Sequence, residues 1–363
     1  MNRRYIYIII GAVTMLLTAC SSDSEPTVDG GRTPIRLAAT VDEAVLTRAA
    51  SGLVETNRFA SGSTIGVYAY SSSGILKDDG TTGNLVNEPI AVGGSTSSYA
   101  TGRYWPTDAV GFWGYYPRVD LGNLGSPRID LGEPRIDLGI PETLQFTMPT
   151  NSAEQPDLLV SEYTTATLSQ TQNGAVPLVF HHALSQIRFY VLLDADPDGD
   201  WYTAYSNDKI AVDVSLTNIY TQGTLTISTT PADNDWGGHS WGSHAVTGTS
   251  KASAVKWTKV DASTLTSFSP SDYSVNDADK MLVIPCDYTS GTMPTMEVTI
   301  KATDSDQSET LTATVENYDS NSDDVYDQVR WRPGYIYNYY FVLELGKTIK
   351  GYFLIPALEA EQW

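Results

Sequence analysis

Apolar and polar residues alternate in a series of short segments along this chain, and the alternation limits the fold to β-structure. Apolar side chains recur at every second position in residues 65–70, 210–216 and 296–302 of the 363-residue chain. Period two sets one face of a strand against a core and the other toward solvent. No long segment has the 3.6-residue period of an amphipathic helix. The sequence therefore predicts an all-β fold, with a single helical turn near residues 182–185.

The start of the chain has the pattern of a lipoprotein signal peptide. Arg3 and Arg4 precede an apolar run over residues 5–17, and small residues then lead to Cys20. This run is shorter than the roughly 20 apolar residues that cross a bilayer, and a polar segment follows the cysteine directly. We expect residues 1–19 to be removed and Cys20 to become the acylated N-terminus.

Charge and cysteine content restrict the partners. The chain has 22 Lys and Arg residues against 43 Asp and Glu residues, a net charge of -21. Such a balance argues against nucleic acid and anionic lipid headgroups as partners, so attachment to a membrane is expected through the lipid. The cysteines are Cys20 and Cys286, and acylation of the first leaves no intramolecular disulfide. Cys286 follows a strand-like apolar run, which favours a buried, unreactive thiol.

The length of the chain predicts two domains, because one core usually stops growing below this size. The passage between the strand-like runs 176–181 and 186–193 is the expected junction. We place the N-terminal domain at residues 49–183 and the C-terminal domain at residues 184–363.

One hexapeptide occurs three times. The copies begin at Pro117 (Pro-Arg-Val-Asp-Leu-Gly), at Pro127 and at Pro134 (both Pro-Arg-Ile-Asp-Leu-Gly). Their period is too short for a solenoid. The sequence favours a duplicated, extended loop, and a role of this loop in binding is the alternative.

Two segments have residue types that suit metal or sugar binding. Residues 194–200 carry acidic residues at positions one, three, five and seven and Gly at six, as in a calcium loop, but position twelve is Tyr205 instead of Glu. A solvated acidic turn is the alternative. Residues 236–244 hold Trp236, Trp241, His239 and His244, which suit a metal or a sugar ring, although simple packing is favoured.

Known catalytic motifs are missing from the sequence. His181 and His182 end a strand-like run, where alternation points them to opposite faces and favours structural roles. We found no nucleophile elbow, zincin helix, phosphate-binding Gly loop or dinucleotide fingerprint. We therefore expect no enzyme activity, no cofactor and no metal. A hydrolase with an unrecognised carboxylate pair is the weakest alternative.

Several landmarks resemble, in order and spacing, the fimbrillin family of type V pili, the lipoprotein pilins of Gram-negative gut and oral anaerobes. They are the lipobox ending at Cys20, Tyr104-Trp105-Pro106 followed by residues 110–117, Asp157-Leu158-Leu159-Val160, residues 176–185, and Trp331-Arg332-Pro333-Gly334-Tyr335-Ile336-Tyr337. The resemblance implies two tandem transthyretin-like Greek-key β-sandwich domains and a subunit that polymerises by strand exchange. The hexapeptide repeat looks like an insertion relative to this pattern.

The same resemblance implies site residues at both ends of the chain. Residues 33–42 alternate as a first strand, and a trypsin-like protease is expected to cut after Arg48, which makes residues 20–48 a lipidated propeptide. The apolar C-terminal segment 348–363 is the candidate donor strand for another subunit. Its apolar residues are Tyr352, Phe353, Leu354, Ile355, Leu358 and Trp363. The alternative is a last strand packed in its own domain.

These observations predict a pilus subunit of the shaft or tip that serves adhesion. We expect it first as a surface-exposed outer-membrane lipoprotein and then in the fimbrium, with other pilin subunits, the protease and the membrane as its partners. The alternative is a glycan-binding lipoprotein that keeps its anchor at Cys20 and uses Trp236 and Trp241 against sugar rings.

Overall fold

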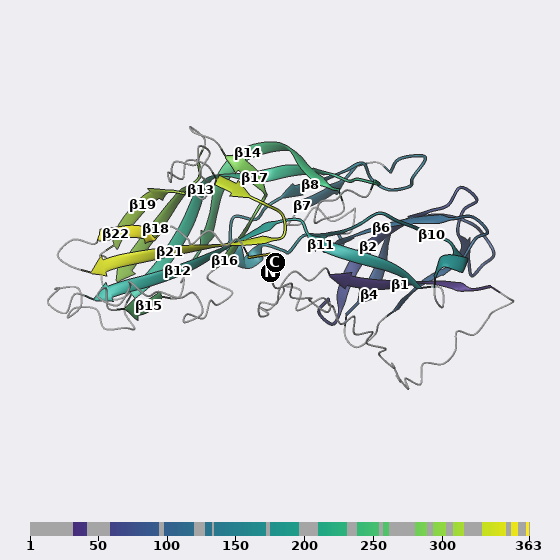
Figure 1. The fold of residues 1–363 in the computed structure, drawn as a ribbon, viewed down its shortest axis with the longest axis horizontal. Helices are drawn as coiled ribbons and strands as arrows, with labels where there is room; N and C mark the ends of the chain where they lie inside the picture. Colours follow the sequence, from purple (N-terminus) through teal and green to yellow (C-terminus); the bar gives the residue numbers. More distant parts are fainter. Residues whose placement is uncertain are drawn as a thin grey trace, which may run out of the picture.

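The structure is a computed structural model. It describes residues 32–41, 59–93, 98–119, 128–132, 134–171, 175–195, 210–230, 238–253, 257–260, 280–288, 293–302, 308–315, 329–345, 350–354 and 361–362. The described part is almost entirely β-structure, which confirms the predicted fold class. It is elongated, with the N-terminal strands at one end and the C-terminal strands at the other (Figure 1).

The N-terminal half is one nine-stranded sheet. Its order is β3-β5-β1-β11-β9-β6-β2-β4, with β10 beside β6. The strands are β1 (Pro34–Val41), β2 (Ser63–Tyr70), β3 (Leu76–Lys77), β4 (Leu85–Val92), β5 (Tyr99–Tyr104), β6 (Val110–Tyr116), β9 (Leu159–Ser161), β10 (Thr164–Ala166) and β11 (Ala175–His182).

This sheet wraps around a first core of buried apolar side chains. The core takes residues from strands distant in sequence, including Leu37, Ile65, Phe112 and Leu178, all with no exposed surface. Strands β2 and β6 are buried on both faces, so the face of residues 65–70 that the alternation predicts to be solvent-exposed is largely covered instead. Tyr68 on β2 points away from the first core and packs in a separate cluster, the junction core described below.

The C-terminal half is a sandwich of two six-stranded sheets. One sheet has the order β15-β12-β21-β22, with β16 and β23 beside it, and the other has the order β19-β18-β13-β8-β7, with β14 beside β13. A second core that includes Ile187, Val214, Val298 and Trp331 lies between them. The strands of the first sheet are β12 (Ser185–Ala195), β15 (Trp257–Val260), β16 (Lys280–Val283), β21 (Tyr335–Leu345), β22 (Lys350–Leu354) and β23 (Glu361–Gln362). Those of the second are β7 (Arg128–Leu131), β8 (Thr143–Thr147), β13 (Ile210–Thr226), β14 (Ser240–Ala252), β18 (Thr295–Ala302) and β19 (Ser308–Thr314).

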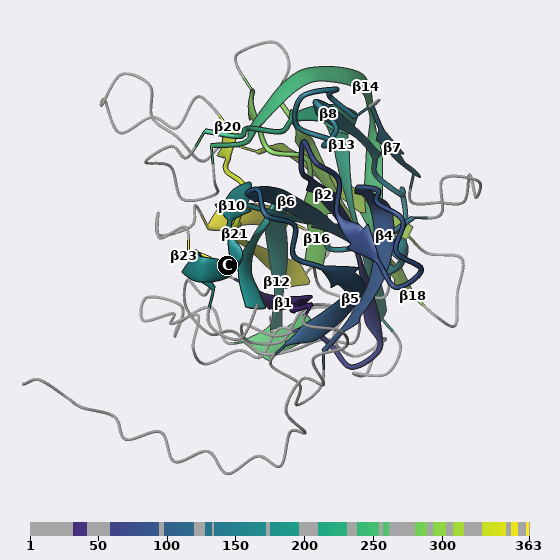
Figure 2. The same ribbon diagram turned by 90° about the vertical axis from the view of Figure 1, so that its right-hand side faces the viewer.

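A hairpin from the N-terminal half crosses to the C-terminal sandwich. We call residues 128–147, which contain β7 and β8, the arm. The arm follows β6 and precedes β9, yet β8 pairs with Gln222–Thr226 of β13 in the far sheet. Figure 2, which looks along the long axis, shows β7 and β8 beside β13 while the N-terminal strands lie in front. The arm therefore ties the two halves together.

A junction core fills the contact between the halves. It gathers side chains from the N-terminal sheet, the arm and the C-terminal sandwich. Its buried members are Tyr68, Trp113, Tyr115, Ile129, Ile140, Leu144, Phe146, Met148, Leu158, Val160, Ala183, Leu184, Leu225, Ile227, Leu282 and Ile284. Ala183 and Leu184, where we expected the domain junction, are both buried in it.

The remaining elements are short. Strands β17 (Cys286–Tyr288) and β20 (Val329–Trp331) form a two-stranded sheet, and the described residues also contain the 3-10 turns η1 (Ser152–Glu154) and η2 (Leu168–Gln170). The helical turn expected near residues 182–185 is wrong, because the chain only bends there between β11 and β12. Among the residues that the structure describes, no helix has the length and apolar character to cross a membrane.

Candidate assembly site

Strand β1 occupies an interior position of the N-terminal sheet. It pairs antiparallel with β5, through Arg36 opposite Ala100 and Leu37 opposite Tyr99. On its other side it pairs in parallel with β11 from Arg36 to Val41. A strand with neighbours on both sides completes two hydrogen-bond ladders, so its loss would leave unpaired backbone groups on both neighbours.

The inward face of β1 is wholly apolar. Ile35, Leu37, Ala39 and Val41 alternate with exposed or half-buried residues and are at most 9% exposed. This is the alternation that the sequence predicts for residues 33–42. Full burial of a Val, Leu or Ile side chain stabilises a fold by about 1.5–3 kcal/mol. The first core therefore depends directly on β1.

Polar contacts fix the register of β1. The Thr101 hydroxyl is buried and donates to the Ile35 carbonyl oxygen at 2.9 Å. The Arg36 Nε donates to the Ser98 hydroxyl at 3.0 Å, and the Trp105 backbone N–H donates to the Thr33 carbonyl at 3.1 Å. These bonds hold the strand at its start and middle.

After β1 the described chain resumes at Phe59. The Phe59 ring is buried, with its centroid 5.1 Å from that of Phe180 and 5.5 Å from that of Tyr116, both in edge-to-face contact. Residues 42–58 thus connect two anchored points of the first core. Cys20 and Arg48, the residues predicted for lipidation and cleavage, lie outside the described residues.

The last strands lie at the edge of the C-terminal sandwich. β21 pairs in parallel with β12, and β22 covers the other side of β21, with Tyr352 opposite Val342 and Phe353 opposite Phe341. β22 ends this sheet in the strand order, so it has one paired side in the described chain. Tyr352, Phe353 and Leu354 of the predicted donor segment therefore pair with their own chain, whereas Ile355, Leu358 and Trp363 lie outside the described residues.

Comparison with known families identifies the chain. A model of the fimbrillin-like family matches residues 47–353. The chain belongs to the fimbrillin-like family. The matched range starts after β1 and ends in β22, so it contains most of the described structure of this fimbrillin-like protein.

Solved structures that this chain matches include three proteins from Bacteroides species. A proposed cell adhesion protein from Bacteroides uniformis is 15% identical with a TM-score of 0.46, and the alignment covers 91% of this chain and 99% of that one. A fimbrial protein from Bacteroides vulgatus is 14% identical with a TM-score of 0.40, covering 82% and 92%. A proposed polysaccharide-binding protein from Bacteroides thetaiotaomicron is 11% identical with a TM-score of 0.36, covering 83% and 93%. A search of curated protein sequences finds no match.

The described His and Trp side chains of residues 236–244 do not share a site in this fimbrillin-like protein. Each makes a separate contact with its neighbours. His239 Nε2 lies 2.9 Å from the Ser161 carbonyl oxygen, and His244 Nε2 lies 2.9 Å from that of Pro285. The Trp241 indole N–H donates to the Ala183 carbonyl at 2.6 Å, and its ring covers Gly223. Trp236 lies outside the described residues. The three described side chains therefore have local partners that favour the packing interpretation.

His181 and His182 both become buried at the end of β11. They point to opposite faces, as alternation predicts, but both faces are covered here and the residues are 7% and 6% exposed. His181 Nε2 lies 3.2 Å from a Glu162 carboxylate oxygen, and His182 Nδ1 lies 3.0 Å from one of Asp157. These pairs are consistent with the structural roles expected from sequence.

The remaining candidates show no ligand cluster. Cys286 is half-buried, and this burial raises the pKa of its thiol to about 11, with the Asp287 carboxylate adding to the effect, which favours the protonated thiol at neutral pH. Asp194 lies in β12, whereas the other acidic residues of the predicted calcium loop fall outside the described residues. Within the described ranges, no group of three or more His, Cys, Asp or Glu side chains is arranged to hold a metal.

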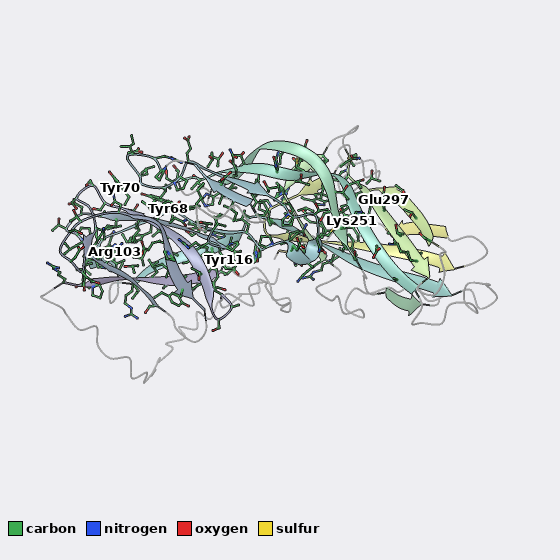
Figure 3. All side chains as sticks on the ribbon, turned by 180° about the vertical axis from the view of Figure 1, so that it is seen from behind. Tyr68, Tyr70, Arg103, Tyr116, Lys251 and Glu297 are labelled. Atoms are coloured by element: carbon green, nitrogen blue, oxygen red, sulfur yellow. The ribbon has the colours of Figure 1, made fainter. Side chains whose placement is uncertain are left out.

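Sequence reasoning missed the residues that hold the junction together. Gln155 accepts from the Leu282 backbone N–H at 2.7 Å and donates to the Ser250 hydroxyl at 2.7 Å. The Lys251 backbone N–H donates to the Thr150 carbonyl at 2.8 Å. Figure 3 shows Lys251 in the C-terminal half, whereas Tyr68 marks the N-terminal half. A lone glutamine after a short turn has no local sequence pattern that signals such a contact.

We expect acid to weaken this junction through His239. The residue is 1% exposed, and burial lowers its pKa from 6.5 to about 4, with the nearby His181 acting in the same direction and Glu162 and the Ser161 carbonyl opposing it. Its Nδ1 accepts from the Ser228 backbone N–H at 3.0 Å, which requires the neutral ring. Because the unfolded imidazole binds a proton more readily, the free energy of unfolding should fall as pH drops from 6.5 to 4, by about 3 kcal/mol.

Urea unfolding at pH 7, 5 and 4 measures this effect. His239→Gln should be less stable at pH 7 and should lose less stability than the wild type between pH 6.5 and 4. His244→Gln, at a half-buried imidazole that lies against the Pro285 carbonyl, is the matched control for replacement of a histidine. Equal pH dependence in the wild type and His239→Gln would contradict the assignment.

Proposed function

We propose that this fimbrillin-like protein is a structural subunit of a surface pilus that serves adhesion. In this proposal it is exported as a lipoprotein on Cys20, cut after Arg48 and polymerised by strand exchange. The fimbrillin-like family supports the coarser statement, a fimbrial subunit that assembles with other subunits at the cell surface.

One observation carries the strand-exchange step. β1 is an interior strand with an apolar face in the first core, yet it precedes the segment with the expected cleavage site and has only residues 42–58 to connect it to the rest of the core. A cut after Arg48 would turn β1 into a separate peptide held only by non-covalent contacts. Its departure would leave β5 and β11 with unpaired edges beside an apolar groove, which an extended segment can fill by β-augmentation.

The C-terminal segment 348–363 is the proposed donor. Its described strands are β22, which lies at a sheet edge and pairs on one side with β21, and β23, which pairs with Tyr335 and Ile336 of β21. Release of an edge strand breaks one ladder, whereas release of an interior strand breaks two. The last strand of a free subunit can therefore exchange its own edge position for the two-sided position left by β1 in a neighbour.

The folded chain also restricts where a trypsin-like protease can cut. Arg36, Arg103 and Arg188 lie inside β1, β5 and β12, where paired backbone cannot enter a protease active site in extended form. Proteases cut preferentially in exposed, unpaired segments. These three arginines are therefore disfavoured as cleavage sites, whereas the proposed site, Arg48, lies in none of the described strands.

Replacement of Arg48 by alanine is the decisive test. We expect Arg48→Ala subunits to keep β1 and the lipid and to stay monomeric, because no new N-terminus forms and the position of β1 stays filled. The mass of the mature N-terminus and the ladder of stable oligomers on gels of surface fractions measure both effects. Arg32→Ala, at the other end of β1, is the matched control and should mature at Ala49 and polymerise normally. Unchanged polymers from Arg48→Ala would refute the processing step.

The glycan-binding alternative has less support. It requires exposed indole faces, but the Trp241 N–H is bonded to the Ala183 carbonyl and its ring packs on Gly223. An anchored binding protein would also keep Cys20 and β1 in its mature form. The N-terminal mass measured above therefore separates the two functions directly.

A further inference from the structure

The three copies of the hexapeptide lie in three different settings. The first copy starts at the end of β6, where Val119 donates its N–H to the Tyr115 hydroxyl and accepts from the Asn87 amide at 3.0 Å. The second copy forms β7 at the outer edge of the arm. The third copy forms the tip of the same hairpin. One sequence thus adopts at least two structures in the same element.

The arm is a long hairpin in a single register. Ile129 lies opposite Phe146 and Leu131 opposite Leu144. Beyond β7 the pairing continues with the Gly132 N–H donating to Thr143, a bridge between Pro134 and Pro141, and the Arg135 N–H donating to Ile140. Gly139, at φ +63°, closes the tip by donating to the Arg135 carbonyl at 2.7 Å.

Equivalent isoleucines of the second and third copies have opposite exposure. Ile129 is 6% exposed and belongs to the junction core, whereas Ile136 is 95% exposed at the tip. Both sit in the same Pro-Arg-Ile-Asp-Leu-Gly sequence. Local sequence therefore does not decide which isoleucine is buried, and only the register of the hairpin does.

We infer that the arm has a second register, in which the third copy replaces the second opposite β8. The copies are seven residues apart, as Arg128 and Arg135 show, so the shift places Ile136 opposite Phe146 and Leu138 opposite Leu144. An ordinary slip by an odd number of residues would turn polar side chains into the core. Here the repeated sequence presents the same side chains again, and the apolar face is restored.

The shifted hairpin has an ordinary loop. In the described register the chain between Leu131 and Leu144 includes the bridged prolines and the tip. In the shifted register only residues 139–143 join the two strands, within the roughly two to five residues of common hairpin loops. The displaced residues 127–133 join the connection that precedes the strand, so the number of residues in the arm region is unchanged.

The described register is the more stable of the two. It buries Ile140 completely and lets the Arg135 guanidinium donate to the Ile227 carbonyl at 2.8 Å, and both contacts are lost on shifting. The shifted register is therefore a minor state that becomes important when the second copy is pulled away or altered. β7 is an edge strand. When it is displaced, the third copy takes its place beside β8, so that β8 stays paired and the junction core stays covered.

A double-mutant cycle on the full chain tests this inference without reference to pilus assembly. Ile136→Asp alone should leave the thermal unfolding midpoint unchanged, because the side chain is exposed. Ile129→Asp alone should lower it moderately, because the third copy takes over. The unfolding midpoint of the double variant should lie more than about 3 °C below the value expected from the sum of the two single shifts, although the effects of distant substitutions are normally additive. Additive effects would overturn the inference.

Two deletions provide a second test if the aspartate variants do not fold. Deletion of residues 127–133 leaves the third copy followed by Ile140, and deletion of residues 134–140 leaves the second copy followed by Glu133. We expect both variants to fold and to keep slow hydrogen exchange of the β8 amides, because each leaves one copy opposite β8 and a five-residue loop. Fast exchange in β8 of the first variant would show that the third copy cannot take the place of β7.

Discussion

Replacement of Trp113 by alanine is expected to separate the unfolding of the two halves. Trp113 has no exposed surface, and its ring centroid lies 5.7 Å from that of Tyr68 and 5.8 Å from that of Tyr115 in the junction core. Truncation of a buried tryptophan usually costs about 3–5 kcal/mol, through lost burial and a residual cavity. Because this cost falls on the contact between the halves, calorimetry should show two transitions where the wild type shows one.

The neighbouring Phe112 supplies the matched control. It lies on the same strand but faces the first core, where its ring is 6.0 Å from that of Trp105. Phe112→Ala should cost a similar free energy but lower the stability of the N-terminal half alone. If both variants gave the same calorimetric profile, the junction core would not be an independent coupling element.

Replacement of Leu37 by aspartate should destabilise the precursor severely and leave the processed protein unaffected. Leu37 is completely buried in the first core, so the substitution removes apolar burial and places a carboxylate in an apolar environment. We expect a loss of at least about 4 kcal/mol in the free energy of unfolding. If the chain is cut after Arg48 and loses β1, as we propose, the processed variant and the processed wild type would have the same sequence.

Thr40→Asp on the same strand is the control, because Thr40 is exposed. Denaturant unfolding of both precursors should separate the two variants clearly, and unfolding of the processed chains should not. A difference that persisted after processing would mean that β1 remains bound in the mature protein.

The sequence predicts the strands that have one covered face. β1 and the strands at residues 210–216 and 296–302 occur where alternation places them, because each lies between a core and solvent. It predicts β6 less well, since the first core covers Phe112 and the junction core covers Trp113, which removes alternation. Sequence periodicity indicates burial on one face of a strand, but it does not reveal a second core that covers the other face.

The arm could not be predicted either. Pairing of β8 with β13 joins residues far apart in the sequence, and no local pattern specifies such a partner. The three hexapeptides have nearly the same sequence, yet one forms a sheet edge and another a hairpin tip, because tertiary contacts select the register of the hairpin. We expected one extended loop on the basis of local sequence, whereas pairing with the distant sheet decides the structure of the arm.

The position of the arm also bears on the order of events during synthesis. The residues of β8 leave the ribosome well before those of β13, their only partner besides β7 in that sheet. Until β13 arrives, the apolar face of the arm, with Leu144 and Phe146, can be shielded only by the N-terminal half. A C-terminal fragment made alone would therefore lack β7 and β8, and residues 222–226 of β13 would have no partner strand on that side.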